Sequence, residues 1–271
     1  MTTLTPTLHG TDELSAGIAR FAPLSLDELN DSAALQTRID RKYLVSLDRL
    51  DDVLAAMDPG TRVLEIDGER AFAYASVYFD TPGLSSYLGA ARRRRDRFKV
   101  RTRSYLDTGS CWVEVKTRGP RGATIKTRQE HATDRPDSLP APAWQFASGA
   151  LGGHRVAELD GPLAPTLVST YRRTTLHVPG QHGGPASRTT IDTDLVWTDP
   201  RTDAEHPLRG LAIVETKTGS AASPTDRLLW RHGIRPVRIS KYGTGMAVLH
   251  PELPAQPWRR VLDRHVAPRA A

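Results

Sequence analysis

Two neighbouring segments of this chain, 97–105 and 112–117, place charged side chains at every second position. Successive side chains of a β-strand point to opposite faces, so this period of two predicts strands with one charged face. Turn residues at 107–110 join the two segments, and a third strand, 123–130, is expected after the turn at 118–122. We therefore predict three successive antiparallel strands. The charged residues of these strands are Lys99, Arg101, Arg103, Glu114, Lys116, Lys126 and Arg128, and Trp112 lies on the same face of its strand as Glu114 and Lys116.

Charged strands are also predicted in segments 37–45, 166–178, 188–197 and 208–218. A solvated sheet face is the simplest interpretation of any one such strand. Across so many strands, however, arginine is unusually dense, and apolar side chains consistently lie on the opposite faces. If the sheet closes into a barrel with helices outside, the charged faces converge on its interior. These cations would repel one another unless a polyanion, with some acids or a metal ion, occupied that space.

The expected organisation is a disordered arm at 1–20, a single domain at 21–250 and a loose tail at 251–271. Helices are predicted to begin at Ser25 and Ser46, two residues suited to cap a helix.

Later in the chain, proline-flanked residues 132–165 predict a helical excursion, and Ser223-Pro224 predicts the start of another helix. The dipeptide Asp67-Gly68 predicts a hairpin between 62–66 and 71–79. Residues 237–240 are predicted to form a last short strand.

Composition limits the classes of function. The 271 residues carry a net charge of +6, which indicates an anionic partner. Cys111 is the single cysteine, so an intramolecular disulfide and a cysteine-based zinc site are both excluded. The N-terminal residues have no signal-peptide pattern and no apolar run is long enough to span a bilayer, so a cytoplasmic protein is expected. Common nucleotide-loop, zinc-protease and serine-hydrolase motifs are absent.

Several sequence blocks, kept in order over residues 20–250, together resemble one known family. They are Arg-Ile-Asp-Arg-Lys-Tyr at 38–43, Val-Tyr-Phe-Asp-Thr-Pro at 77–82, Phe-Lys-Val-Arg-Thr-Arg-Ser-Tyr at 98–105, Val-Glu-Val-Lys at 113–116, Tyr-Arg-Arg-Thr-Thr-Leu at 171–176, Thr-Ile-Asp-Thr-Asp-Leu at 190–195, Ile-Val-Glu-Thr-Lys at 213–217 and Ile-Ser-Lys-Tyr at 239–242. This set resembles the VTC domain, a polyphosphate polymerase domain of the triphosphate tunnel metalloenzymes, or CYTH-like superfamily.

The resemblance implies an α+β fold in which about eight antiparallel strands close into a barrel, the triphosphate tunnel, with helices packed outside. It implies basic residues that bind a nucleoside triphosphate or polyphosphate together with Mn²⁺ or Mg²⁺. Catalytic roles are expected for Arg101, Arg103, Lys116, Arg173, Arg188 and Lys241. Substrate binding is expected for Lys42, Lys126, Arg128, Tyr171 and Glu114, and metal binding for Glu215 and Asp40. Of the adjacent pair Arg172 and Arg173, shared parity with Tyr171 favours Arg173 as the inward residue.

One block departs from the superfamily pattern. The superfamily opens with Glu-x-Glu-x-Lys, whereas this chain has Arg38-x-Asp40-x-Lys42 and lacks the first carboxylate. This departure weakens the case for a second metal site and favours a polymerase of the VTC branch over a hydrolase. The main hypothesis is transfer of the ATP γ-phosphoryl group to polyphosphate.

Three alternatives remain open at this point. Water could attack the triphosphate with Glu114 as general base, or the protein could bind polyphosphate or nucleotides without catalysis. The run Arg92–Arg95 with Arg97 could instead contact nucleic acid, but aromatic side chains that could stack on bases are sparse. We therefore expect no nucleic-acid partner, and we expect the run to steer polyanions toward the site.

Overall fold

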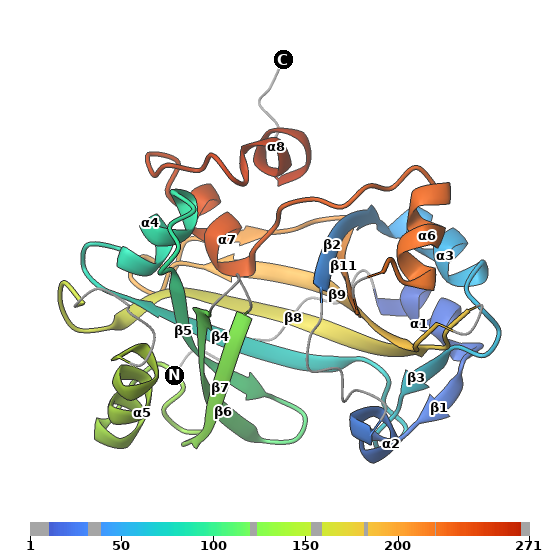
Figure 1. Ribbon diagram of the computed structural model, residues 1–271, viewed down its shortest axis with the longest axis horizontal. Helices are drawn as coiled ribbons and strands as arrows, with labels where there is room; N and C mark the ends of the chain where they lie inside the picture. The colour runs from blue at the N-terminus through green and yellow to red at the C-terminus, as the bar shows by residue number, and fades with distance from the viewer. Residues whose placement is uncertain are drawn as a thin grey trace. The chain divides into compact units, whose positions relative to one another are not determined.

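The computed structural model describes residues 11–31, 39–119, 124–152, 159–181, 184–219 and 221–266 (Figure 1). The described chain falls into two compact units. The first unit draws on Met1–Phe72, Arg172–Leu195 and Leu208–Val237, and the second on Ala73–Tyr171, Val196–Pro207 and Arg238–Ala271.

One large antiparallel sheet, with helices packed on it, makes the fold α+β, as predicted. Its main hydrogen-bonded order is β2-β11-β9-β8-β4-β5-β6-β7. Within the described residues no pairing joins β2 to β7, so hydrogen bonds do not close the sheet and the closed barrel stays a prediction. The strands are β2 (Ile39–Ser46), β4 (Phe72–Asp80), β5 (Phe98–Tyr105), β6 (Ser110–Arg118), β7 (Thr124–His131), β8 (Ala164–Val178), β9 (Ser187–Thr198) and β11 (Leu211–Thr218), and the short β10 (Glu205–Pro207) pairs with β9.

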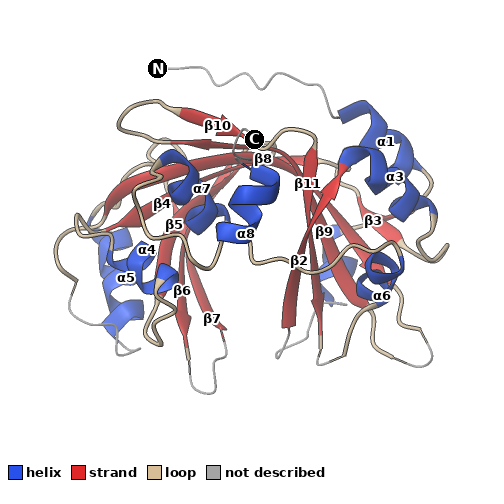
Figure 2. Cartoon of the chain, turned by 90° about the horizontal axis from the view of Figure 1, so that it is seen from above, coloured by secondary structure: helices blue, strands red, loops and turns tan. Residues whose placement is uncertain are grey.

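The first unit packs three helices on one face of β2, β11 and β9. These are α1 (Thr11–Ala19), α3 (Leu47–Ala55) and α6 (Pro224–Arg231) (Figures 1 and 2). Apolar strand residues such as Tyr43 and Val214 are buried beneath them, as the helical stripe after Ser46 predicts. The opposite strand face carries the charged residues, because side chains alternate along each strand.

The second unit contains the predicted run of three strands. Helix α5 (Ala141–Gly152) contacts β6 and β7 and buries Val113 and Val115 on the face opposite the charges. Helices α4 (Ser85–Ala91) and α7 (Lys241–Leu249) contact each other. The charged face of β5, β6 and β7 is therefore the face that α5 leaves uncovered.

The predicted hairpin at Asp67-Gly68 is only partly correct. The tight turn forms, with positive φ at both residues and a bridge between Ile66 and Glu69. The preceding strand, β3 (Arg62–Leu64), however, pairs with β1 (Ala22–Leu24) and β8. Burial of Val63 in the core of the first unit favours those partners over β4.

The strand predicted at 237–240 is wrong, because this stretch has no partner strand in the described chain. The Val237 N–H donates instead to the Lys42 carbonyl oxygen at 2.7 Å, and the Ser240 hydroxyl caps α7. Ser25 and Glu28, by contrast, form the predicted capping box of α2 (Leu26–Asp31).

Within the segments expected to be an arm and a tail, the described residues include packed helical turns. The expected arm contains α1, whose Leu14 and Ile18 are buried against the first unit, while residues 1–10 lie outside the described part. In the expected tail, α8 (Arg259–Val261) and a π-helical turn (Leu262–Val266) follow Trp258, whose ring lies 5.5 Å from that of Tyr87. No helix among the described residues has the length and apolar character needed to cross a membrane.

Candidate functional site

Three strands of the second unit arrange their charged side chains in rows across the sheet. The register places Lys99, Lys116 and Lys126 directly opposite one another on β5, β6 and β7. The next row is Arg101, Glu114 and Arg128, and the one after it is Arg103, Trp112 and Glu130. Directly opposite residues share a face of the sheet, so the three rows form one surface. That surface carries many more positive than negative side chains.

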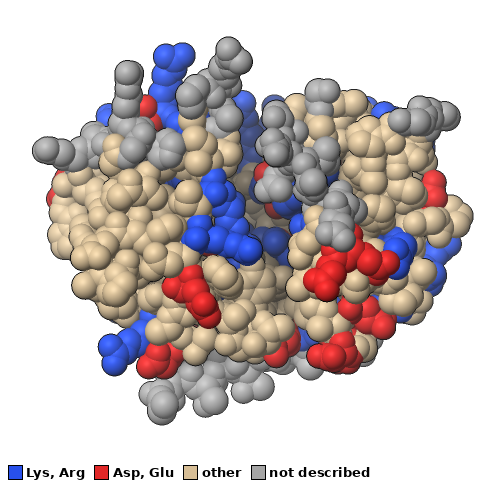
Figure 3. Space-filling model, turned by 60° about the horizontal axis from the view of Figure 1, so that its bottom comes forward, with Lys and Arg blue, Asp and Glu red and all other residues tan. Residues whose placement is uncertain are grey.

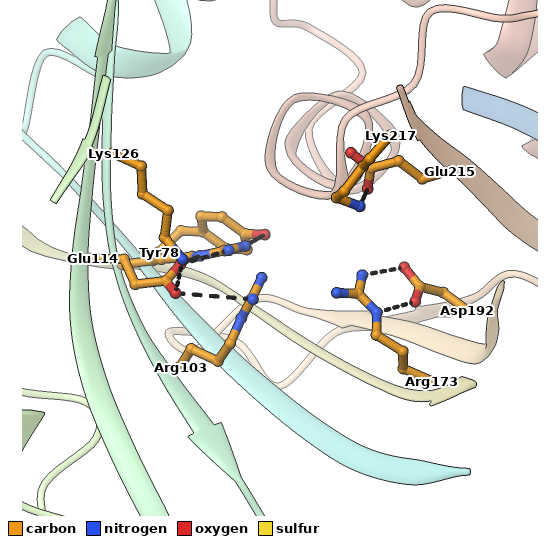
Figure 4. Close-up of polar contacts among 9 residues, drawn as sticks. Tyr78, Arg103, Glu114, Lys126, Arg173, Asp192, Glu215 and Lys217 are labelled. Atoms are coloured by element: carbon orange, nitrogen blue, oxygen red, sulfur yellow. Dashed lines mark hydrogen bonds and ion pairs between the residues drawn. The ribbon is translucent and has the colours of Figure 1, made fainter. Parts of the chain in front are cut away.

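Glu114 is the point on which the cations of this surface converge. The Arg101 guanidinium donates to its Oε2 from Nε at 2.9 Å and from Nη2 at 2.7 Å. The Lys126 Nζ lies 2.6 Å and the Arg103 Nη1 3.8 Å from its Oε1 (Figure 4). The Glu114 side chain is fully buried, whereas the Lys126 side chain retains 31% exposure. One carboxylate thus holds three cations in place.

The protonation of this cluster follows from burial and charge. Burial alone would raise the pKa of Glu114, but the charges of Arg101, Arg103 and Lys126 outweigh it and hold that pKa far below its usual value. Burial lowers the pKa of Lys126, although the Glu114 charge opposes this shift. Glu114 is therefore ionised at neutral pH, and the cluster as a whole is positive.

Tyrosines support the cationic residues of the second unit. The Tyr78 hydroxyl accepts from the Arg101 Nη1 at 3.2 Å, because β4 and β5 pair these two residues directly. The Lys241 Nζ, at the start of α7, lies 4.1 Å from the centre of the Tyr171 ring, a cation–π contact. Tyr171 in turn stacks on Tyr74 at 5.3 Å.

The first unit carries a second charged cluster, built on β2, β11, β9 and β8. The Lys42 Nζ lies 2.8 Å from the Glu215 Oε1, and the Lys217 Nζ lies 3.4 Å from Oε2. The Arg173 fork donates to both oxygens of Asp192, at 2.6 and 2.8 Å (Figure 4). Here too the carboxylates of Glu215 and Asp192 are engaged by cations.

Burial of Glu215 would raise its pKa, but the charges of Lys217, Lys42 and Arg173 lower it well below the usual value. Burial lowers the pKa of Lys217 to about 8, against the opposing charge of Glu215. On the face drawn in Figure 3, one group of Lys and Arg side chains lies near the middle, and further Lys, Arg, Asp and Glu side chains are spread around it.

Comparison with known protein families identifies the family of this chain. The model of the VTC domain family matches residues 37–250 of the chain. This protein belongs to the VTC domain family.

The fold is also similar to two solved structures. One is a protein of Bacillus halodurans described as a candidate adenylate cyclase, with 15% identity, coverage of 75% of this chain and 94% of that chain, and a TM-score of 0.45. The other is a candidate adenylyl cyclase of Hippeastrum described as having a dominant triphosphatase activity, with 13% identity, coverage of 78% and 96%, and a TM-score of 0.43. No curated protein matches the chain.

The metal that the VTC family implies can be tested against the donors present. The described residues contain no group of three or more His, Cys, Asp or Glu side chains that could hold a metal ion. Asp40 lies on the face of Glu215, opposite Lys217 in the register, while Arg38 lies outside the described residues. Mg²⁺ is commonly held by one or two carboxylates, with phosphate and water completing its shell. These residues therefore fit a metal that binds together with its phosphate ligands. They do not fit a metal coordinated by protein side chains alone.

The structure brings several of the predicted site residues together within each unit. Arg101, Arg103, Glu114 and Lys126 are in contact in the second unit, where Lys116 lies on the same face. Lys42 contacts Glu215 in the first unit. Two predicted residues make other contacts: Arg128 stacks over Trp112 at 4.6 Å, and Arg188 donates to the Leu29 carbonyl oxygen at 3.0 Å.

Three residues that contact the charged clusters were not among the predicted site residues. Lys217 lies two positions from Glu215 and Asp192 shares parity with Arg188, so strand periodicity could have included both. Tyr78 could not have been found in this way, because its contact depends on the pairing of β4 with β5. The adjacent arginines have different partners: Arg173 donates to Asp192, and Arg172 donates to the Ala71 carbonyl oxygen at 2.7 Å.

Proposed function

We propose that this chain is a metal-dependent phosphotransferase that moves the γ-phosphoryl group of ATP onto the end of a polyphosphate chain. Membership of the VTC domain family supports an activity on nucleotides or polyphosphate. Phosphoryl transfer is catalysed mainly by positioning and by stabilisation of negative charge, and both requirements are met by fixed cations.

The row of Lys99, Lys116 and Lys126 is the observation that carries the proposal. Like charges directly opposite one another on neighbouring strands destabilise a sheet. Anions placed among the lysines reduce this repulsion. Glu114 is one such anion beside the row, and bound phosphates would add further negative charge. The row is therefore best explained as a binding surface for a polyanion.

The arginines beside this row suit phosphate oxygens, because a planar guanidinium fork can donate two parallel hydrogen bonds to them. Arg101 and Lys126 are already oriented toward one point by Glu114. Little reorganisation is then required when phosphate arrives. The first unit has a charged cluster of its own, in which Glu215 is the residue that would hold a phosphate-bound Mn²⁺ or Mg²⁺. The metal would supply further neutralisation of phosphate charge.

The state of Glu114 favours transfer to phosphate over hydrolysis. Attack by water benefits from a general base with a pKa near neutrality. The pKa of Glu114 is instead held far below its usual range, and both of its oxygens contact cations, Oε2 that of Arg101 and Oε1 those of Arg103 and Lys126. A terminal phosphate oxygen of polyphosphate is already anionic and needs no such base.

The direct test incubates the purified chain with ATP labelled at the γ-phosphate, in the presence of Mn²⁺ or Mg²⁺. The expected product is acid-stable polyphosphate that lengthens with time. Release of orthophosphate without chain growth would identify a triphosphatase. Binding of triphosphate without any turnover would leave a polyphosphate-binding protein.

Replacement of Lys116 tests the proposed binding surface. Lys116→Gln should weaken triphosphate binding by on the order of tenfold, because a lysine–phosphate contact is lost. Its melting temperature should stay equal or rise, since the repulsion within the lysine row is relieved. Calorimetric titration and thermal unfolding measure both effects.

Arg118→Gln is the matched control, because Arg118 is exposed, shares the parity of Lys116 and ends the same strand. Triphosphate affinity should be nearly unchanged in this control. Equal effects of the two substitutions would mean that only net charge matters, and the proposed surface would be wrong.

A further inference from the structure

Trp112 occupies an unusual position on the charged face of the second unit. It lies two residues from Glu114 on β6, in the row that also contains Arg103 and Glu130. Adjacent rows are about 7 Å apart along the strands, since each residue advances a strand by about 3.3 Å. The lysine row, the Glu114 row and the Trp112 row thus follow one another along the same face.

The indole of Trp112 is available in a way that the neighbouring tyrosine rings are not. Tyr78 stacks on Tyr242, and Tyr74 packs against both Tyr105 and Tyr171. In the described part of the chain no ring contact joins Trp112 to another aromatic side chain, and its side chain is only partly buried. The exposed Arg128 lies beside the indole, with its guanidinium 4.6 Å from the ring centre.

We propose that Trp112, with Arg128 beside it, is a stacking site for the nucleobase of a nucleoside triphosphate. The inference rests on the proposed function and specifies its substrate class, because it requires the phosphates to bind at Arg101 and Lys126. The nucleotide then lies along the strands, with its phosphates toward the lysine row and its base over the indole.

Stacking accounts for the residue types found in this row. Aromatic and guanidinium planes both stack on bases, and a base stacked on one aromatic side chain gains affinity with little dependence on which base it is. Arg128 is exposed, so its guanidinium can move to the far side of an incoming base. The site should therefore prefer nucleoside triphosphates to inorganic triphosphate, with similar affinity for ATP and GTP.

The test compares ATP, GTP and inorganic triphosphate as ligands of the full chain by calorimetric titration. The unmodified protein should bind both nucleotides more tightly than inorganic triphosphate. Trp112→Leu should reduce the ratio of ATP affinity to triphosphate affinity by on the order of tenfold. Trp112→Phe should retain most of that ratio, because a phenyl ring still stacks. If the leucine variant does not fold, Trp112→Gln, which also lacks a ring, replaces it and should lose the ratio in the same way.

Trp144→Leu is the control for loss of a tryptophan, because Trp144 lies on α5 against the opposite face of the sheet. Its ratio of affinities should equal that of the unmodified protein. The inference is overturned if Trp112→Leu lowers both affinities equally or changes neither. Failure of the unmodified protein to bind inorganic triphosphate would instead overturn the proposed function, so the two failures are distinguishable.

Discussion

At the scale of single residues, Glu114 organises the cations of the second unit. A buried carboxylate held by two arginines and a lysine neutralises part of their repulsion and fixes their directions. Phosphate oxygens can replace the carboxylate oxygens as acceptors for the same donors. The stability of the ligand-free protein and its affinity for phosphate are therefore linked through one side chain.

Glu114→Gln should lower the free energy of unfolding by about 3 kcal/mol, because it leaves Arg101, Arg103 and Lys126 without their shared anion. Added inorganic triphosphate should recover more stability in this variant than in the unmodified protein. Thermal unfolding with and without triphosphate measures both effects. Glu130→Gln, an exposed change on the same face, should cost less than about 0.5 kcal/mol.

The pH dependence of stability gives an independent measure of the same substitution. A folded-state pKa below the ordinary value of 4.5 means that ionised Glu114 stabilises the fold above that pH, and that this contribution is lost as the pH falls further. Urea unfolding between pH 6 and about pH 3 should show a smaller loss in Glu114→Gln than in the unmodified protein. Parallel pH profiles of the two proteins would contradict the cluster.

At the scale of elements, α7 is fixed by close packing and by a buried hydrogen-bond network. Asp80 accepts from the Tyr242 hydroxyl and from the backbone N–H groups of Ser86 and Tyr87. Burial raises the pKa of Asp80 despite these hydrogen bonds. Because Lys241 is the first residue of α7, this network also determines where the Lys241 ammonium lies.

The glycines of α7 have a packing role that the sequence did not reveal. A Cβ added at Gly245 would lie 2.4 Å from the Trp197 ring, and one at Gly243 would lie 2.0 Å from the Trp258 ring. Both allow close approach of a tryptophan to the helix.

Gly245→Ala should lower the free energy of unfolding by about 1–3 kcal/mol, since a methyl group overpacks the contact with Trp197. Gly149→Ala in α5 is the matched change, because no atom lies within 4 Å of the added Cβ. That substitution should raise stability by about 0.5–1 kcal/mol through helix propensity. Denaturant unfolding of both variants measures whether the free energy of unfolding falls in Gly245→Ala and rises in Gly149→Ala.

At the scale of the whole molecule, the net charge of +6 is expected to attract polyanions over distances beyond direct contact. The four consecutive arginines that follow α4, residues 92–95, are all exposed. Exposed charges act mainly on the rate of encounter, and dissolved salt screens them.

Replacing Arg92–Arg95 with glutamine should slow association of triphosphate on the order of tenfold at low salt and have little effect on dissociation. The difference should vanish in high salt, as stopped-flow kinetics can measure. A variant with the same change of net charge has glutamine at four other exposed arginines, Arg227, Arg231, Arg235 and Arg238. Equal slowing in both variants would show that net charge acts without a local steering effect.

The sequence alone determined the local pattern of this protein. Alternation along 97–105 and 112–117 identified the charged face of β5 and β6, because the period of a strand needs no knowledge of its partners. Capping residues located the starts of α2 and α6 for the same reason. The blocks of sequence also identified the VTC family correctly.

Only the tertiary structure decided which of these faces and residues meet. The contact of Tyr78 with Arg101, the pairing of β3 with β8, and the approach of Trp197 to Gly245 each join residues distant in the chain. Strand register and close packing depend on the burial of whole surfaces, which no short stretch of sequence contains. For the same reason, the tail at Trp258 is packed although its local composition predicts a loose segment.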